Sequence, residues 1–318
     1  MEQPDFRIQD DTGGAMHTGL STRPRRPRGN FHQIAAPLLF LLPNMLIFVL
    51  FIIIPAFQGL RMSLTDWGIF TGSRWVGLRN FERLLSDRVF WITVQNTLVY
   101  SAATVALLTV VSLGLAMLLH RNDLRGEKAY RSAFYLPSLL SMVTVGIAWR
   151  FILGDEMGIV NYILRTLGGP GVGWLTDGGL AMASVIGVSL WAQAGYYMVI
   201  MISGLQAIPP SLYEAARIDG AGRAQTFFHI TLPLLKSTLL VVMVLSNISA
   251  FKAYELITVM TGGGPGYATK LIVQQVYQVA FMEDRMGYAA AMSVALMAII
   301  GLFTLVQFRL TGKEQDYE

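Results

Sequence analysis

The sequence of 318 residues contains no cysteine. This absence excludes disulfides, zinc–thiolate sites, iron–sulfur clusters and a cysteine nucleophile. Charge is also scarce, since 14% of the residues are Asp, Glu, Lys or Arg, against about 25% in an ordinary soluble domain. With 53% hydrophobic residues, the chain has too few charged groups to cover a soluble surface. The composition indicates an integral membrane protein.

Six apolar stretches each reach the length of about 20 residues that crosses the hydrocarbon layer of a membrane. They are Ile34–Gly59, Ile92–Leu119, Ala133–Leu153, Leu180–Leu205, Leu234–Ile257 and Tyr288–Phe308. The sequence therefore predicts an all-α membrane protein, with six transmembrane helices in a domain that covers residues 34–310.

Histidine and intramembrane carboxylates are sparse as well. All four histidines, His17, His32, His120 and His229, fall in polar segments outside the predicted spans. An ion-coupled carrier usually keeps carboxylates or histidines deep in the membrane, so their absence from the middle of every span disfavours a secondary transporter. It equally disfavours an intramembrane enzyme with a serine–histidine pair, and we predict neither catalytic nor metal-binding residues.

The sequence also lacks a phosphate-binding loop of the form G-x-x-x-x-G-K-[ST]. Energy for uphill transport therefore has to come from a partner, and no cofactor is expected on this chain. The formal net charge of +4 is too small to suggest a nucleic-acid partner.

Lysine and arginine in the loops predict the orientation of the spans. One set of polar segments carries 14 Lys and Arg when Lys236 is included, and the alternate set carries 8. The richer set consists of residues 1–33, 120–132, 206–233 and 309–318. Both termini are therefore predicted to be cytoplasmic, with residues 1–33 a disordered basic tail and 311–318 a short C-terminal tail.

The loop of residues 206–233 between the fourth and fifth spans has its own local pattern. Pro209-Pro210 ends the preceding span, and Ser211 with Glu214 predicts a capping box at the start of a short helix. Ala215 and Ala216 leave room for close approach of another surface. Gly220 allows a turn, and a second helical piece follows over Arg223–His229. The pattern fits either a docking element or an inert amphipathic loop.

The spacing in this loop resembles the EAA signature of bacterial ABC importer permeases. It reads Glu214-Ala215-Ala216, three residues, Gly220, nine residues, Ile230, one residue, Leu232-Pro233. Three further segments, Tyr254–Leu271, Tyr277–Phe281 and Gly287–Ser293, resemble the maltose-transporter-type family of carbohydrate permeases. Within the first of these, the Thr261-GGGPG stretch resembles the first of the two permease types of such systems.

The resemblance implies a type I ABC importer permease fold in the bacterial cytoplasmic membrane. The expected partners are a second homologous permease in a heterodimer, two ATPase subunits that use ATP and Mg, an extracytoplasmic solute-binding protein or lipoprotein, and membrane lipid. This chain would be the non-catalytic permease subunit, and the solute a sugar, either a di- or an oligosaccharide. Glycerol 3-phosphate or another polar solute is the alternative.

The resemblance also assigns residues. Contact with the ATPase is expected from Glu214, Ala215, Ala216, Asp219 and Gly220. Contact with the binding protein is expected from Gly263, Gly264 and Pro265.

A sugar path needs aromatic faces together with amide and hydroxyl groups. Spans four and five offer both at helical spacing, in Gln193, Tyr196, Tyr197, Asn247, Phe251 and Tyr254, with Lys252 beside them. These side chains line the path or simply join neighbouring helices. Lys252 and Glu255, three residues apart, are predicted to form an ion pair.

Five arginines make the predicted outer segment 60–91 basic: Arg61, Arg74, Arg79, Arg83 and Arg88. They pair either with an acidic surface of the binding protein or with Asp66, Glu82 and Asp87 nearby.

Overall fold

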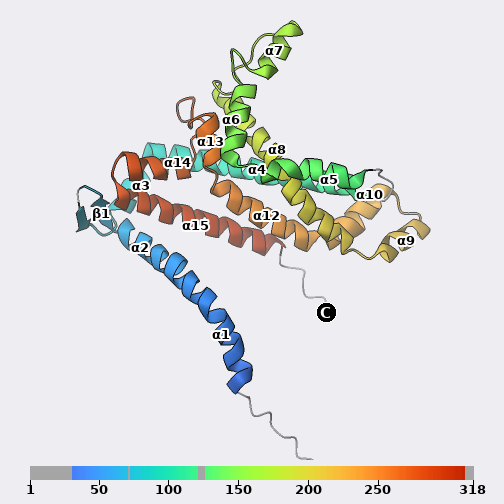
Figure 1. The fold of residues 1–318 in the computed structure, drawn as a ribbon, viewed down its shortest axis with the longest axis horizontal. Coiled ribbons are helices and arrows are strands. Elements are labelled where there is room, and N and C mark those ends of the chain that lie inside the picture. Colours follow the sequence, from blue (N-terminus) through green and yellow to red (C-terminus); the bar gives the residue numbers. More distant parts are fainter. Residues whose placement is uncertain (1–30, 71, 121–125, 312–318) are drawn as a thin grey trace, which may run out of the picture. The chain divides into compact units, whose positions relative to one another are not determined.

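A computed structural model describes residues 31–70, 72–120 and 126–311 of the chain (Figure 1). The chain divides into two compact units, residues 1–55 and 56–318. In the first unit, helix α1 (Phe31–Phe48) continues into a π-helical turn η1 (Val49–Ile53). Helix α2 (Ile54–Ser63) begins at the end of this unit and lies mainly in the second. Residues 1–30 of the predicted basic tail lie outside the described residues, whereas residues 31–33 already belong to α1.

Three predicted spans of the second unit are long single helices. They are α4 (Arg88–Leu119), α8 (Gly178–Gln206) and α15 (Met286–Thr311). The described residues contain four helices that are long and apolar enough to cross a membrane, counting Leu39–Ser63, and up to six if each of two bent pairs is one span. The prediction of a helical, multi-pass membrane protein is thus confirmed in outline.

The third predicted span, Ala133–Leu153, is not a single helix. It consists of α5 (Glu127–Tyr135), a 3-10 turn η2 (Leu136–Leu139) and α6 (Met142–Ile152), with a bend of 97° between the two halves. Pro137 lies in the turn and cannot donate a backbone hydrogen bond. In addition, α8 passes so close that a Cβ on Gly195 would overlap the carbonyl oxygen of Phe134.

The fifth predicted span, Leu234–Ile257, is also interrupted. Helix α12 (Lys236–Phe251) is bent by 66° from the segment before it, and α13 (Glu255–Met260) begins only after a break at residues 252–254. The predicted ion pair fails for this reason: Lys252 and Glu255 lie on different helices, and neither forms a salt bridge with a residue that the structure describes.

The prediction of an all-α chain needs one correction, in the segment after α2. Strand β1 (Thr65–Gly68) pairs antiparallel with β2 (Gly72–Trp75), and Thr65 lies opposite Trp75. Gly72 has a φ of +77°, which glycine adopts without cost. Asp284 holds the tip of this hairpin, because its carboxylate accepts hydrogen bonds from Ile69 N (2.6 Å) and Phe70 N (3.1 Å).

The remaining helices are short and complete the second unit. They are α3 (Arg79–Ser86), α7 (Ile159–Thr166), α9 (Pro210–Ile218), α10 (Arg223–Thr226), η3 (Phe227–Thr231), α11 (Leu232–Leu234), α14 (Ile272–Tyr277) and η4 (Gln278–Met282). In the core, α4 packs against α8 and α12, and α12 packs against α15.

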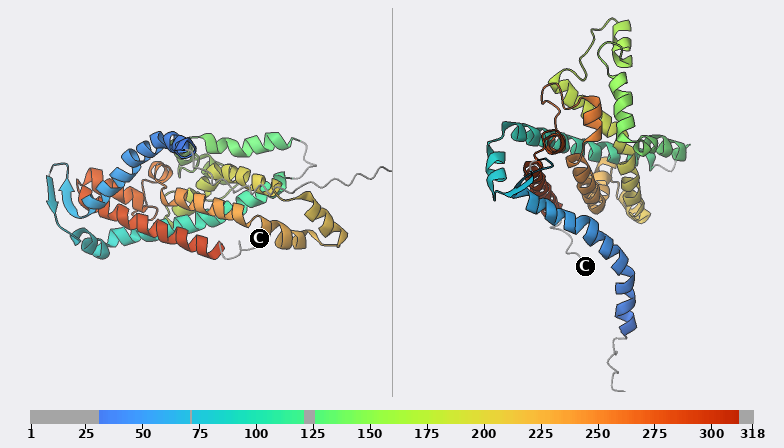
Figure 2. Two further views of the ribbon diagram at one scale, coloured as in Figure 1. Left: turned by 90° about the horizontal axis from the view of Figure 1, so that it is seen from below. Right: turned by 60° about the vertical axis from the view of Figure 1, so that its left-hand side comes forward.

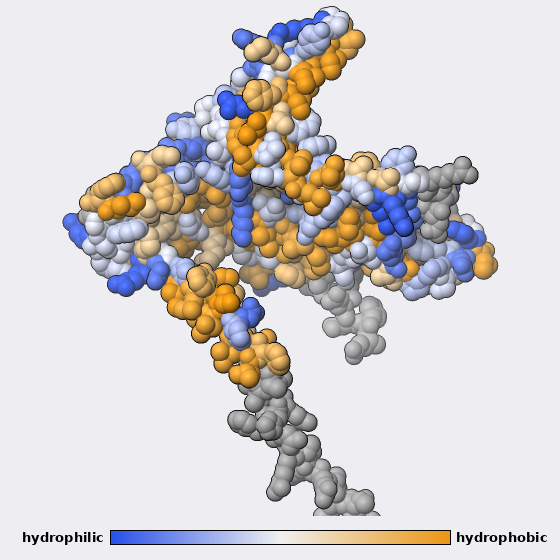
Figure 3. Space-filling view, viewed as in Figure 1, coloured by the Kyte–Doolittle hydropathy of each residue, from blue (hydrophilic) through white to orange (hydrophobic). Residues whose placement is uncertain are grey.

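The second unit has two ends that lie far apart, and both are polar. The β1–β2 hairpin and α3 lie at one end of the helices, and α9 with α10 lies at the opposite end in both views (Figures 1 and 2). Hydrophilic residues gather at these two ends, and apolar residues cover much of the helices between them (Figure 3). The 206–233 loop and the hairpin thus lie at the two polar ends of the second unit.

Candidate functional site

Helix α9 forms where the sequence predicts it, but it begins differently. Its N-cap is Pro209, no side chain caps its first turn, and Pro210 is its first residue. Proline suits this position because its missing N–H would have no partner there. The predicted capping box of Ser211 and Glu214 is therefore wrong, since Ser211 already lies inside the helix.

The end of α9 is a tight glycine turn. Ala221 N donates to Ala216 O (2.9 Å) and Gly220 N donates to Arg217 O (3.1 Å), the two hydrogen bonds of a Schellman motif. Gly220 has a φ of +73°, and nothing lies within 4 Å of the place where a Cβ would be. The backbone conformation, and not lack of space, therefore requires glycine here.

The inner side of α9 is fixed to the chain that follows it. Tyr213 and Ala216, three residues apart, face inward, and Ala216 is 6% exposed. The Tyr213 hydroxyl is hydrogen-bonded to Oγ1 of Thr231 in η3 (3.2 Å). Because η3 leads directly into α11 and α12, this hydrogen bond joins α9 to the segment that precedes α12.

The outer side of α9 is open. Of the predicted coupling residues, Glu214, Ala215, Asp219 and Gly220 are exposed, whereas Ala216 packs inside the chain. Ile218 is 86% exposed and lies three residues after Ala215, so it extends the same side. It was not predicted as a site residue, although an apolar residue at this spacing beside charged ones is a usable signal.

The predicted path residues on α8 do not share one environment. Tyr196 is 44% exposed, whereas Tyr197 is 3% exposed, and their rings meet edge-on at 5.1 Å. Gln193 Oε1 accepts a hydrogen bond from Ser249 Oγ of α12 (3.2 Å). Gln193 and Tyr196 are therefore accessible, and Tyr197 is part of the core.

The predicted face on span five is divided by the break in the chain. Asn247 and Phe251 are buried within this subunit, and the Phe251 ring lies 5.5 Å from that of Phe303 in α15. The Asn247 Nδ2 has no hydrogen-bond partner among the described residues. Ser249 of α12 and Lys252, in the break directly after the helix, are exposed instead.

The loop that follows α13 contains the three residues predicted to contact the binding protein, and they differ in exposure. Gly263 is buried against Lys270, Gly264 is partly exposed and Pro265 is exposed. Thr269 N donates to Gly263 O (3.2 Å), and its hydroxyl donates to Gly264 O (2.8 Å).

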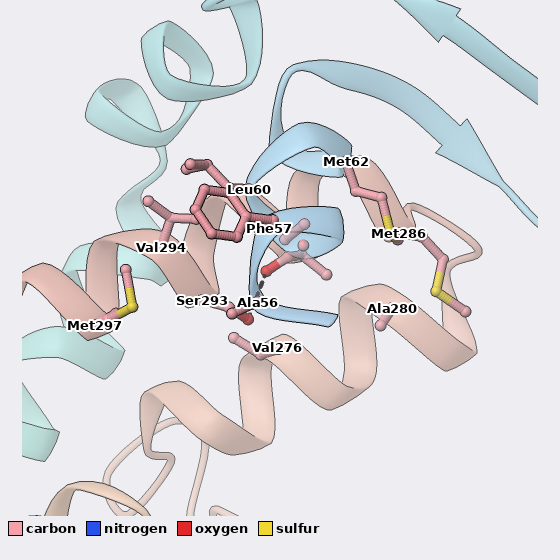
Figure 4. Close-up of a pocket in the computed structure, with 13 residues that line it drawn as sticks. Ala56, Phe57, Leu60, Met62, Val276, Ala280, Met286, Ser293, Val294 and Met297 are labelled. Atoms are coloured by element: carbon pink, nitrogen blue, oxygen red, sulfur yellow. Dashed lines mark hydrogen bonds between the residues drawn. The ribbon is translucent and has the colours of Figure 1, made fainter. Parts of the chain in front are cut away.

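An apolar cavity of about 530 Å³ lies between α2, the α14–η4 segment and α15 (Figure 4). Phe57 and Leu60 of α2 face Val276 and Val294 across it. Ser293 is the only polar side chain in the lining, and its hydroxyl already donates to Ala289 O (3.0 Å). A sugar needs many hydrogen-bond partners, so this cavity does not suit one.

At the hairpin end, the outer arginines are exposed. The five arginines between residues 61 and 88 form no ion pair with any carboxylate that the structure describes. Asp87 is already engaged: its Oδ1 accepts from Val89 N (2.8 Å) and Phe90 N (3.2 Å), and its Oδ2 accepts from the Tyr288 hydroxyl (2.7 Å). The proposed internal pairing with Asp66, Glu82 and Asp87 is therefore not found.

Residues 113–313 match a protein family described as the inner membrane component of binding-protein-dependent transport systems. Two relatives match most of the chain. The sn-glycerol-3-phosphate transport system permease protein UgpA of Agrobacterium fabrum is 36% identical over 88% of this chain and 96% of its own. The diacetylchitobiose uptake system permease protein NgcF of Streptomyces coelicolor is 32% identical over 91% of this chain and 87% of its own.

A solved structure has the same fold. It is a bacterial ABC transporter involved in the import of the acidic polysaccharide alginate, and one of its chains matches with a TM-score of 0.78 and 24% identity. The match covers 89% of this chain and 97% of that one.

Proposed function

Since the chain belongs to the family of inner membrane components of binding-protein-dependent transport systems, we propose that it is the transmembrane permease subunit of an ABC importer that moves a sugar inward by alternating access. The observation that carries this proposal is α9, a short helix at one end of the long helices. Its outer side is open, its end is closed by the Gly220 turn, and its inner side is tied to η3.

An ATPase subunit docks on the open side of α9 and drives the transport cycle. Glu214, Ala215, Asp219 and Ile218 form the contact surface, and the Tyr213–Thr231 hydrogen bond (3.2 Å) passes the movement to α12. A rigid element transmits movement that a flexible loop would absorb. The ATPase uses ATP and Mg, so this chain contributes no catalytic group.

The remaining partners follow from the two ends of the chain. A second, homologous permease completes the pathway as a heterodimer, and two ATPase subunits bind on the cytoplasmic side together with both termini. The solute-binding protein meets the opposite end, where Pro265 and the hairpin are exposed. The exposed arginines there suit an acidic surface on that protein.

A sugar is the solute that the accessible side chains favour. Tyr196, Tyr254 and Ser249 offer aromatic faces and a hydroxyl group, the combination that binds sugars. Glycerol 3-phosphate is the second candidate, because UgpA is 36% identical and Lys252 is exposed at the break. A phosphate group is bound best by several charged donors in defined geometry, which places the sugar first.

Transport in proteoliposomes tests the function. The vesicles contain the full complex of both permeases and the ATPase, with the purified binding protein outside, and the probes are diacetylchitobiose, maltose and sn-glycerol 3-phosphate. We expect ATP-dependent uptake of a sugar. Uptake of sn-glycerol 3-phosphate alone would establish the second candidate, and no ATP-dependent uptake of any probe would contradict the proposal.

Substitutions in α9 test the coupling role in the same vesicles. Glu214→Lys and Gly220→Val should leave the complex assembled but abolish uptake while ATP hydrolysis continues. Valine at a φ of +73° costs about 1–3 kcal/mol of backbone strain. Gly220→Asn is the matched control, because asparagine tolerates this conformation, and it should keep most of the uptake.

Full uptake by Glu214→Lys or by Gly220→Val would contradict a role for α9 in coupling. Loss of uptake by Gly220→Asn to the same degree as by Gly220→Val would show that the conformation of the turn is not what matters.

A further inference from the structure

Three aromatic rings contact one another in series: one comes from the break after α12, and two come from the continuous α14–η4 stretch. Tyr254 lies in the break between α12 and α13, Tyr277 ends α14, and Phe281 lies in η4. The ring centroids of Tyr254 and Tyr277 are 5.5 Å apart, and those of Tyr277 and Phe281 are 5.0 Å apart. The three side chains form one continuous aromatic surface.

This surface is accessible. Tyr277 is 42% exposed and Phe281 is 59% exposed, while Tyr254 is partly buried. Aromatic residues at such exposures would ordinarily suit contact with lipid, so the neighbouring side chains decide what the surface faces.

Exposed charged and amide residues are sequence neighbours of the aromatic residues. Lys252 and Glu255 are exposed on either side of Tyr254, and Gln278 is exposed directly after Tyr277. Lys252 and Glu255 form no ion pair with a described residue. Charges left unpaired against hydrocarbon are expensive. The exposed charges therefore favour contact with water over contact with lipid tails.

Hydrogen bonds hold the segments that carry the rings. Gln274 Nε2 donates to Thr258 Oγ1 (2.9 Å) and joins α14 to α13. Lys270 Nζ donates to Gln278 Oε1 (2.5 Å), and Gln278 Nε2 donates to Glu283 Oε1 (3.3 Å).

The backbone that carries Phe281 is itself unusual. Residues 278–282 form a π-helical turn, a conformation that is rare and frequent at functional sites. Glu283 N donates to Gln278 O (3.1 Å) across this turn. The rings are thus set in place before any solute arrives.

We propose that Tyr254, Tyr277 and Phe281 form an aromatic track that binds the faces of sugar rings on their way through the importer. The inference rests on the proposed function, in which the solute is a sugar. The C–H face of a pyranose packs on an aromatic ring, and Lys252 and Glu255, which are exposed in the sequence on either side of Tyr254, are available to bond the hydroxyls.

A track of successive rings also suits transport better than a single tight site. Passage requires binding that is favourable enough for entry and weak or multiple enough for release. A sugar that moves from one ring to the next exchanges one stacking contact for another, so no single position holds it strongly.

Uptake kinetics of the full complex in proteoliposomes test the track. The probe is whichever sugar of diacetylchitobiose and maltose the wild-type complex imports. For Tyr277→Ala and Phe281→Ala we expect a rise of roughly tenfold in KM, the size of one lost stacking contact, with a smaller change in kcat. Tyr277→Phe and Phe281→Tyr keep the rings and should leave KM near the wild-type value.

Two controls separate lost stacking from damaged structure. Tyr277→Leu keeps an apolar side chain without the ring and should raise KM as the alanine variant does. Phe151→Ala removes an aromatic residue of α6 that is 75% exposed and outside the track, and should leave KM unchanged. The basal ATPase rate and the amount of assembled complex are measured for every variant.

The outcomes distinguish the two proposals. A wild-type complex that imports no sugar contradicts the proposed function itself. A wild-type complex that imports the sugar, with KM unchanged in Tyr277→Leu and Phe281→Ala, overturns the track alone. Equal losses in the alanine variants and in Tyr277→Phe and Phe281→Tyr also overturn it, because the aromatic ring would then not be the group that matters.

Discussion

At the scale of single residues, Asp87 joins the starts of two long helices. One carboxylate oxygen caps α4, and the other accepts the hydroxyl of Tyr288 in α15 (2.7 Å). The guanidinium groups of Arg83 and Arg285 lie 5.1 and 4.7 Å from the centre of the Tyr288 ring. The hydroxyl and the ring of Tyr288 therefore contact groups of opposite charge, which fixes α15 beside α3 and α4.

The environment of Asp87 changes its pKa. Burial by itself would raise the pKa, but the hydrogen bonds from Tyr288, Phe90 N and Val89 N, together with the nearby Arg285, outweigh burial and lower the pKa below its ordinary value of 3.8. A lowered pKa in the folded state means that the ionised carboxylate stabilises the fold at neutral pH. This stabilisation is lost as the pH falls through the folded-state pKa.

We predict a pH-dependent effect for Asp87→Asn. Asparagine can still cap a helix but loses the charge, so the purified variant should unfold at a lower temperature than the wild type at neutral pH. The difference should stay constant from about pH 8 to about pH 5 and shrink below pH 3.8, because protonation then removes the same charge from the wild type. A difference that grows towards acid would contradict this account.

At the scale of elements, the packing of α8 against α5 depends on a close approach of the two backbones at Gly195. Gly195 lies where α8 crosses the end of α5, and a Cβ there would overlap the carbonyl group of Phe134. Gly187 lies on the same helix with nothing within 4 Å of its Cβ position. The two glycines therefore form a matched pair with different roles.

We predict that Gly195→Ala destabilises the protein by about 1–3 kcal/mol, the usual cost of overpacking. Gly187→Ala should be neutral or stabilise by up to about 1 kcal/mol, since alanine favours the helix. The thermal midpoint of each purified variant measures the effect. Equal midpoints for the two variants would show that the crossing of α8 and α5 tolerates a side chain.

The long uninterrupted helices could be predicted from the sequence, and the broken ones could not. Uncharged apolar runs gave α4, α8 and α15 to within a few residues, because membrane thickness sets the length of such helices. The hydropathy of a segment is the same whether its helix is straight or bent, so it cannot predict a bend. The break before α6 depends on Pro137 and on the approach of Gly195, which is distant in sequence, and the hairpin at 65–75 has only four residues in each strand.

The sequence predicts those features of the candidate site that depend on residues close together in the chain. Pro209-Pro210, Ser211 and Gly220 predicted a short helix followed by a glycine turn, and α9 is such a helix, although its capping box is absent. The pattern did not reveal that Ala216 faces inward while Ile218 faces outward. Helical periodicity grouped Asn247, Phe251 and Tyr254 on one face, but that grouping assumes a continuous helix, and the chain breaks after Phe251.

At the scale of the whole molecule, the two polar ends of the second unit should lie on opposite sides of the membrane. Because the chain has no cysteine, single cysteines report their side without a competing thiol. Ile218→Cys and Phe70→Cys replace side chains that are 86% and 88% exposed at the two ends. In intact cells, a membrane-impermeant maleimide should label the cysteine at 70 and not the one at 218.

Inverted membrane vesicles supply the complementary experiment, in which the labelling should reverse. Labelling of both positions from the same side would contradict the proposed topology. A lack of labelling at 218 in the assembled complex, with labelling when the ATPase is removed, would show in addition that the ATPase covers α9.

The break at residues 252–254 has a consequence for the timing of the transport cycle. Helix α12 packs against α4, α8 and α15, whereas α13 packs mainly against α6. A single rigid rod would open one end of the pathway at the instant that it closed the other. With a joint between the two helices, we expect α12 to change its tilt while α13 keeps its packing against α6, so that the two ends of the proposed pathway open and close in sequence. An interval with both ends closed would keep solute from leaking back through the importer that we propose.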